Sequence, residues 1–137
     1  MSGRGYEVVE RVPDVANYNR VRGAAGLSVK DGEAARIGLT NTLFGVCVLH
    51  ENEIIGIGRV IGDGGLFYDI VDFAIVPEHQ RKGVGRLILS ALLAYLDEHA
   101  RPSALISLMA NKGVAPFYAK FGFVARDPDM AAMIIRK

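Results

Sequence analysis

The sequence predicts an α/β layered domain, and three observations lead to this prediction. Apolar runs typical of strands alternate along the chain with segments of helical periodicity. Turn residues separate these segments without a linker, an internal repeat or a low-complexity tract. The 137 residues, half of them apolar, suffice for one hydrophobic core, so we expect a single domain over residues 1–137.

The first segments predict a strand and two short helices. Residues 6–11, YEVVER, have the β-branched composition of a strand. Asp14 and Asp31 precede the helix-permissive residues 15–26 and 32–40. Each carboxylate can accept a hydrogen bond from an N–H group of the first turn, which is the usual role of aspartate before a helix.

A hairpin and a third strand should follow. Residues 41–65 hold two apolar, β-branched runs joined at Glu51-Asn52-Glu53, and the second run ends at the glycine-rich turn 62–65. Residues 66–76 then predict another strand, which stops before Pro77.

The next segment is a strongly amphipathic helix that ends at Arg101-Pro102. Its apolar residues recur at intervals of three and four, as in a helix that packs on a sheet: Val84, Leu87, Ile88, Ala91, Leu92 and Tyr95. The apolar residues 104–110, ALISLMA, predict a buried strand.

The last part of the chain predicts one helix and two strands. Residues 113–122 favour a short helix closed by Gly122. Residues 123–126 and 131–136 would form closing strands around a turn at Asp127-Pro128-Asp129. The full order is strand, two helices, three strands, helix, strand, helix and two strands, which is typical of an α/β layered domain.

Composition argues against several classes of protein. The formal net charge is +1, so neither a nucleic-acid surface nor a polybasic membrane patch is expected. No segment has the apolar length of a membrane span, and the amino terminus lacks a signal-peptide core, which predicts a cytoplasmic location. Cys47 is expected to be a small buried residue. His50, His79 and His99 show no shared face or ligand spacing, so no metal site is expected.

The stretch QRKGVGRLIL, residues 80–89, predicts an anion site. A Walker A loop would need Ser or Thr after a Gly-Lys pair, and a dinucleotide fingerprint would need a third glycine where Ile88 stands. Both schemes fail here, but their shared physics remains: glycines let successive N–H groups point at an anion, and the following helix adds its positive N-terminal charge. Arg81, Lys82 and Arg86 can add charge around a pyrophosphate.

Together with a second cluster, this loop resembles the GNAT superfamily of N-acetyltransferases. Residues 80–85, QRKGVG, match the family's Q/R-x-x-G-x-G/A loop, and residues 117–123, FYAKFGF, match its F/L-Y-x-K-x-G-F segment. The resemblance covers nearly the whole chain. It implies a mixed, largely antiparallel central sheet flanked by helices, and acetyl-CoA as co-substrate without a metal.

The resemblance also implies roles for particular residues. Tyr118 corresponds to the general acid that protonates the departing thiolate. The backbones of Ile75 and Val76 would bond the pantetheine arm in the opening that a strand bulge creates. The remaining residues expected to hold the coenzyme are Gln80, Arg81, Lys82, Gly83, Val84, Gly85, Arg86, Asn111, Phe117 and Tyr118.

Two acidic residues are candidates for the base that deprotonates the amine. Asp69 and Asp72 are three residues apart, so they would face opposite sides of a regular strand unless the bulge shifts the register. Asp72 is the first choice, and a water relay would also serve.

The acceptor is expected to be the primary amine of a small molecule. A peptide N-terminus or a lysine side chain is an alternative, and so is a non-catalytic acyl-CoA-binding module. Candidate lining residues are Tyr18, Arg22, Leu27, Ser28 and Phe44, while Asp63 and the two strand aspartates could favour a cationic amine. Apolar residues of the closing strands, Met130, Met133 and Ile134, suggest a homodimer.

Overall fold

The structure, a computed structural model, describes residues 5–126 and 129–137. The chain forms two compact units, Met1–Ser107 and Leu108–Lys137, and each is described by itself. The single domain over residues 1–137 stays a prediction.

The first unit is built on a sheet with strands in the order β1-β2-β3-β4-β5. Its strands are β1 (Tyr6–Glu10), β2 (Phe44–His50), β3 (Glu53–Gly62), β4 (Phe67–Ile75) and β5 (Leu105–Leu108). The first four strands pair antiparallel with their neighbours. Leu105 N–H donates to the Leu66 carbonyl and Ser107 lies opposite Asp69, so β5 runs parallel to β4. The mixed, largely antiparallel sheet is therefore confirmed.

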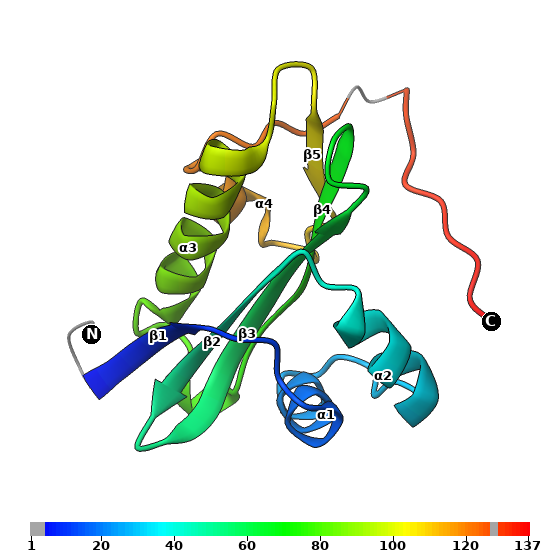
Figure 1. Cartoon of the computed structure of the whole chain (residues 1–137). Helices are drawn as coiled ribbons and strands as arrows, with labels where there is room; N and C mark the ends of the chain where they lie inside the picture. The colour runs from blue at the N-terminus through cyan, green and yellow to red at the C-terminus, as the bar shows by residue number, and fades with distance from the viewer. Residues whose placement is uncertain (1–4, 127–128) are drawn as a thin grey trace. The chain divides into compact units, whose positions relative to one another are not determined.

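Three helices cover the two faces of this sheet (Figure 1). Helices α1 (Val15–Ala24) and α2 (Gly32–Thr40) lie on one face, and α3 (Val84–His99) lies on the other. Both predicted caps are present: Asp14 accepts from Asn17 N–H at 2.7 Å and Asp31 accepts from Ala34 N–H at 2.9 Å. The predicted hairpin turn is also confirmed, and Glu51 and Asn52 adopt the positive φ angles of a two-residue turn.

Close contact between α3 and β3 depends on two glycines. Val84, Ile88 and Leu92 are fully buried on the face of α3 that meets the sheet. A Cβ atom added at Gly58 would lie 2.6 Å from Ile88 Cγ2, and one added at Gly56 would lie 3.1 Å from Ile88 Cδ1. Side chains at these two strand positions would therefore push the helix away from the sheet.

The predicted strand at residues 104–110 exists, but the prediction that it is buried is wrong. β5 comprises only Leu105–Leu108 and is the last strand in the sheet order. Its residues alternate between exposed and half-buried. A continuous apolar run predicts burial on both faces, whereas this strand has the alternating exposure of a sheet margin.

The second unit contains the short helix α4 (Ala115–Ala119). Gly122 has φ +97° and its N–H donates to Ala119 O, as expected for the glycine that closes this helix. The closing strands predicted at 123–126 and 131–136 are wrong for the described residues, which form no strand after α4. The predicted turn falls on Asp127 and Pro128, outside the described residues. An apolar alternating segment becomes a strand only when a partner strand pairs with it.

Candidate functional site

The predicted anion loop lies between the end of β4 and the start of α3. It follows a 3₁₀ turn, η2 (Pro77–His79), and its residues 80–83 are all exposed. Gly83 stands at the N-cap position of α3 with φ +88°, and no atom lies within 4 Å of where its Cβ would be. The backbone therefore turns into the helix at a point where only glycine is free of strain and where space is open in front of it.

The N-terminus of α3 differs from the other two helix starts in this unit. Aspartate side chains cap α1 and α2, whereas no side chain caps α3. Helix geometry leaves the first N–H groups, including those of Val84 and Gly85, without a carbonyl partner inside the helix. A helix N-terminus with these properties can receive an anion.

Ile75 and Val76, the two residues expected to bond the pantetheine, present their backbones to opposite sides of β4. Val76 N–H already donates to the Ile55 carbonyl of β3 at 2.9 Å, so this group points into the sheet. The Ile75 backbone points the other way, because N–H and C=O groups alternate along a strand. Its carbonyl accepts a hydrogen bond from Gln80 Nε2 at 2.9 Å. The backbone of Ile75 therefore faces away from β3, whereas that of Val76 faces β3. The Gln80 side chain holds the Ile75 carbonyl in place.

The bulge that the resemblance implied is present in β4. Ile57 lies opposite Ala74 and Arg59 lies opposite Val71, so Gly58 faces two residues of β4. Asp72 is one of the two, and its φ is +56°. This extra residue shifts the register, as a β-bulge does.

As a result Asp69 and Asp72 lie on the same face of the sheet. Asp69 lies opposite Ile61, and Ile61 is two residues from Arg59, so both point to the same face of the sheet. Asp72 is on that face too, because its carboxylate accepts a hydrogen bond from Arg59. Asp69 is half-buried and accepts a 3.3 Å hydrogen bond from Ser107 Oγ. Burial raises the pKa of the Asp69 carboxyl, and the Ser107 bond opposes this rise.

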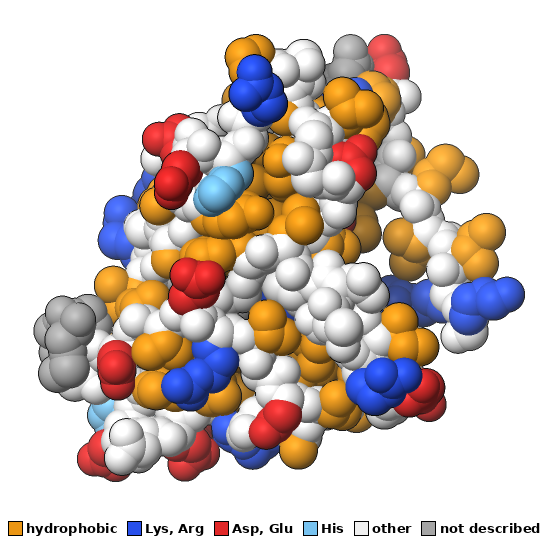
Figure 2. Space-filling model, viewed as in Figure 1, with side chains coloured by type: hydrophobic (Ala, Val, Ile, Leu, Met, Phe, Trp, Pro, Cys, Tyr) orange, Lys and Arg blue, Asp and Glu red, His pale blue; other side chains and the backbone are white. Residues whose placement is uncertain are grey.

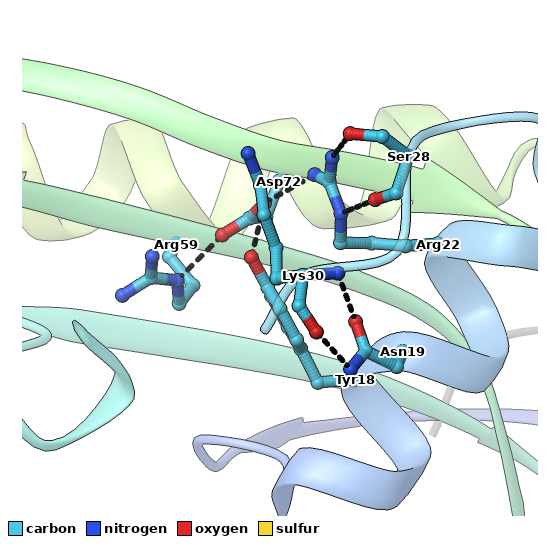
Figure 3. A network of polar contacts seen from close by, with 7 residues as sticks. All are labelled: Tyr18, Asn19, Arg22, Ser28, Lys30, Arg59 and Asp72. Carbon is cyan, nitrogen blue, oxygen red and sulfur yellow. Dashed lines mark hydrogen bonds and ion pairs between the residues drawn. The ribbon is translucent and has the colours of Figure 1, made fainter. Parts of the chain in front are cut away.

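Asp72 is the centre of a buried polar network, shown in Figure 3. Its Oδ1 accepts from Tyr18 Oη at 2.9 Å and from Arg22 Nη1 at 2.6 Å, and its Oδ2 accepts from Arg59 Nε at 2.8 Å. The side chains of the three charged residues are at most 10% exposed. Both guanidinium carbons also lie within 6.0 Å of the Tyr18 ring centre.

Sequence reasoning missed Arg59. It stands in the apolar run EIIGIGRVIG of β3, and a charged residue inside such a run indicates a buried ion pair. Its Nη1 donates to Gly38 O at 3.2 Å and to Thr42 Oγ1 at 2.7 Å, at the C-terminal end of α2. The position of an arginine inside an apolar strand sequence would have been enough to identify this residue as a candidate.

The predicted acceptor residues do not form one group. Tyr18 and Arg22 lie together around Asp72, and Ser28 accepts from Arg22 Nε through its carbonyl. Phe44 instead stacks on Tyr95 of α3 at 4.5 Å, on the other face of the sheet. Leu27 is half-buried. Asp63 is held in its own turn by three backbone N–H groups, which lower the pKa of its carboxyl.

Two histidines lie together, contrary to the expectation of no shared face. The ring centres of His50 and His79 are 4.7 Å apart, and Tyr6 Oη is hydrogen bonded to His79 Nδ1 at 2.7 Å. Burial, followed by the charges of His50 and Lys82, lowers the pKa of His79. Among the described residues no group of three or more His, Cys, Asp or Glu side chains could hold a metal ion.

Cys47 is buried as expected. Its Sγ donates to the Arg11 carbonyl at 3.3 Å, and burial is the first cause that raises the pKa of its thiol to about 11. The thiol is therefore protonated at neutral pH, as for an inert packing residue.

The three remaining predicted residues belong to the second unit. Tyr118 lies on α4 and is buried, with the Phe123 ring edge-on at 6.1 Å. Burial raises the pKa of the Tyr118 phenol. Phe117 is its half-buried neighbour, and Asn111 is an exposed residue whose carbonyl accepts from Val114 N–H.

The surface carries charges of both signs. On the face in Figure 2 acidic and basic side chains are interspersed, and neither sign forms a continuous patch. In the described part of the chain, no helix combines the length and apolar character that crossing a membrane requires.

Relatives of known family resemble this chain in sequence and fold. A Staphylococcus aureus protein described as a probable acetyltransferase is 37% identical; the match covers 96% of this chain and 99% of that protein, with a TM-score of 0.92. The uncharacterized N-acetyltransferase ycf52 of Pyropia yezoensis is 32% identical over 58% of this chain and 44% of its own length. The GCN5-related N-acetyltransferase 2 of Arabidopsis thaliana is 34% identical over 58% of this chain and 30% of its length.

The chain thus aligns with half or less of these two curated relatives. The family model described as an acetyltransferase (GNAT) domain matches residues 23–136, which include the loop before α3, the β4 bulge and Tyr118. The chain belongs to the GNAT family of acetyltransferases.

Proposed function

We propose that this acyltransferase moves an acetyl group from acetyl-CoA to a primary amine of a small molecule. The observation that carries the donor assignment is the start of α3: an uncapped helix N-terminus entered through Gly83, with open space in front of that glycine and exposed Arg81 and Lys82 beside it. These residues suit a pyrophosphate, because backbone N–H groups and cations both stabilise phosphate oxygens. The coenzyme supplies the activated acetyl thioester.

In the proposed reaction the neutral amine attacks the thioester carbonyl, so that a C–N bond forms and the C–S bond breaks. A backbone N–H group after the bulge of β4 polarises the carbonyl oxygen. Tyr118 donates its phenolic proton to the departing thiolate. Burial raises the pKa of this phenol, which keeps it protonated at neutral pH.

The proton of the amine needs an acceptor. Asp69 has the freer carboxylate of the two candidates, since Ser107 gives its one hydrogen bond among the described residues. We propose Asp69, directly or through water, as the base. A pKa raised by burial makes this carboxylate a stronger base than an exposed aspartate.

The amine class is tested by a coenzyme A release assay with a panel of small primary amines, polyamines and peptides. We expect saturable release with at least one small amine and weaker release with peptides. Preference for a peptide N-terminus or a lysine side chain would move the acceptor to the alternative class. Tight acetyl-CoA binding without turnover on any amine would instead favour a binding module.

A homodimer stays a proposal, and so does the cytoplasmic location. The described residues at the C-terminal end expose Met130, Met133, Ile134 and Ile135, and the last two are 57% and 92% exposed. Exposed apolar side chains in such number favour association with a second copy. We expect multi-angle light scattering at about 50 micromolar, a concentration suited to a modest interface, to report twice the chain mass. A chain mass at that concentration would contradict the proposal.

A further inference from the structure

We propose that Asp72 is a positioning residue: its carboxylate fixes the bulge of β4 by tying it to α1, α2 and β3. This inference rests on the proposed function, in which the backbone after the bulge faces the thioester. It also gives Asp72 a role other than that of the base expected from the sequence.

The positive φ of Asp72 requires contacts from the surrounding structure to stabilise it. Its φ of +56° lies in the left-handed region, which L-residues other than glycine seldom adopt, although aspartate and asparagine tolerate it better than most. Such a conformation persists when surrounding contacts over-determine it. The side chain of the same residue supplies these contacts.

Three donors from two elements hold the carboxylate. Tyr18 and Arg22 reach it from α1, at 2.9 and 2.6 Å, and Arg59 reaches it from β3 at 2.8 Å. The pKa of Tyr18 is raised to about 12, first by burial and then by the charge of Asp72, so its phenol remains a donor at every working pH. The hydrogen bond from Tyr18 to the carboxylate therefore does not depend on pH over that range.

Each arginine is in turn anchored to a further segment. Arg22 Nε donates to the Ser28 carbonyl at 2.8 Å, in the connection after α1. Arg59 Nη1 donates to Gly38 O and Thr42 Oγ1, at the end of α2. Figure 3 shows these contacts converging on one carboxylate. The bulge is thereby fixed relative to both helices on this face of the sheet.

These contacts suit positioning better than proton removal. Both carboxylate oxygens already meet donors, and the side chain is 6% exposed. Removing one partner from a buried ion pair leaves the other charges without compensation, so loss of any one contact weakens the rest of the network. Loss of the network would loosen the bulge and the backbone of Ile75 that follows it.

Two substitutions separate the positioning role from that of a base. Asp72→Asn tolerates the positive φ and keeps one acceptor oxygen, while Asp72→Gly allows the φ and removes the carboxylate. We expect acetyl-CoA affinity, measured by calorimetry, to fall about tenfold in Asp72→Asn and further in Asp72→Gly. The pH–rate profile of Asp72→Asn should keep the shape of the wild type. Unchanged affinity in both variants, with one limb of the profile lost in Asp72→Asn, would identify a base and overturn the inference.

A milder variant keeps the test decisive if Asp72→Gly does not fold. Tyr18→Phe removes one donor and keeps the ring, and Tyr95→Phe on α3 is the matched control. We expect amide hydrogen exchange of residues 72–75 to be about tenfold faster in Tyr18→Phe and unchanged in Tyr95→Phe. Equal exchange in both would overturn the inference. This readout needs no coenzyme, so failure of the wild type to bind acetyl-CoA would remove the proposed function without deciding the role of Asp72.

Discussion

Replacing Tyr118 with phenylalanine should lower kcat by about a hundredfold to ten-thousandfold and leave acetyl-CoA affinity nearly unchanged. The substitution removes only the hydroxyl, so the contact of the ring with Phe123 should survive. The lost interaction is the proton transfer to the thiolate, which forms only as the C–S bond breaks. An interaction confined to the transition state contributes to kcat and not to binding of the ground state.

The measurement compares kcat and KM of wild type and variant with the best amine of the panel, while calorimetry gives acetyl-CoA affinity. Tyr95→Phe is the control, because it removes a tyrosine hydroxyl from α3, away from the loop. Because burial raises the pKa of Tyr118, the wild type should retain its proton donor from neutral into mildly alkaline pH. Full kcat in the variant across that range, with chemistry rate-limiting, would show that Tyr118 is structural.

Replacing Gly83 with glutamate should abolish acetyl-CoA binding without unfolding the protein. The new side chain would enter the open space in front of the helix start and place a negative charge where we propose the pyrophosphate. Like charges brought together at a binding site cost several kcal/mol, which corresponds to about a hundredfold or more in Kd. Exposure of the loop limits the effect on the core.

A matched glycine separates charge from backbone strain. Gly64 also has a positive φ, +80° against +88° at Gly83, and no atom lies within 4 Å of its Cβ position. Gly64→Glu should therefore share the strain and keep acetyl-CoA affinity, whereas Gly83→Glu loses it. Gly83→Ala should fall between them. Comparable Kd values for both glutamate variants, each folded by circular dichroism, would refute the loop assignment.

Local signals in the sequence were sufficient for most elements of the first unit. Asp14 and Asp31 act within one helical turn, and the Glu51-Asn52 turn depends on two residues, so neither requires knowledge of the rest of the chain. The loop before α3 could also be predicted, since glycine and charge patterns act locally. The comparison with known proteins then established the family.

Features that depend on pairing between distant segments could not be predicted in the same way. The bulge at Asp72 arises because Gly58, fourteen residues earlier, faces two residues of β4, and no local pattern marks it. The predicted strand at 131–136 failed for a related reason: its composition favours a strand, but pairing decides whether one forms. Phe44 shows the same limit, because assigning its face of the sheet requires the register with Val60.

The two glycines of β3 have a consequence for the search for variants with altered coenzyme affinity. Gly56 and Gly58 set how closely α3 packs on the sheet, and the loop we assign to the pyrophosphate leads directly into the first turn of that same helix. A larger side chain at either glycine would shift α3, and the rigid helix would carry the proposed pyrophosphate loop with it. Random mutagenesis scored on acetyl-CoA affinity should therefore yield hits in the interior of β3, at positions that a map of ligand contacts would leave out.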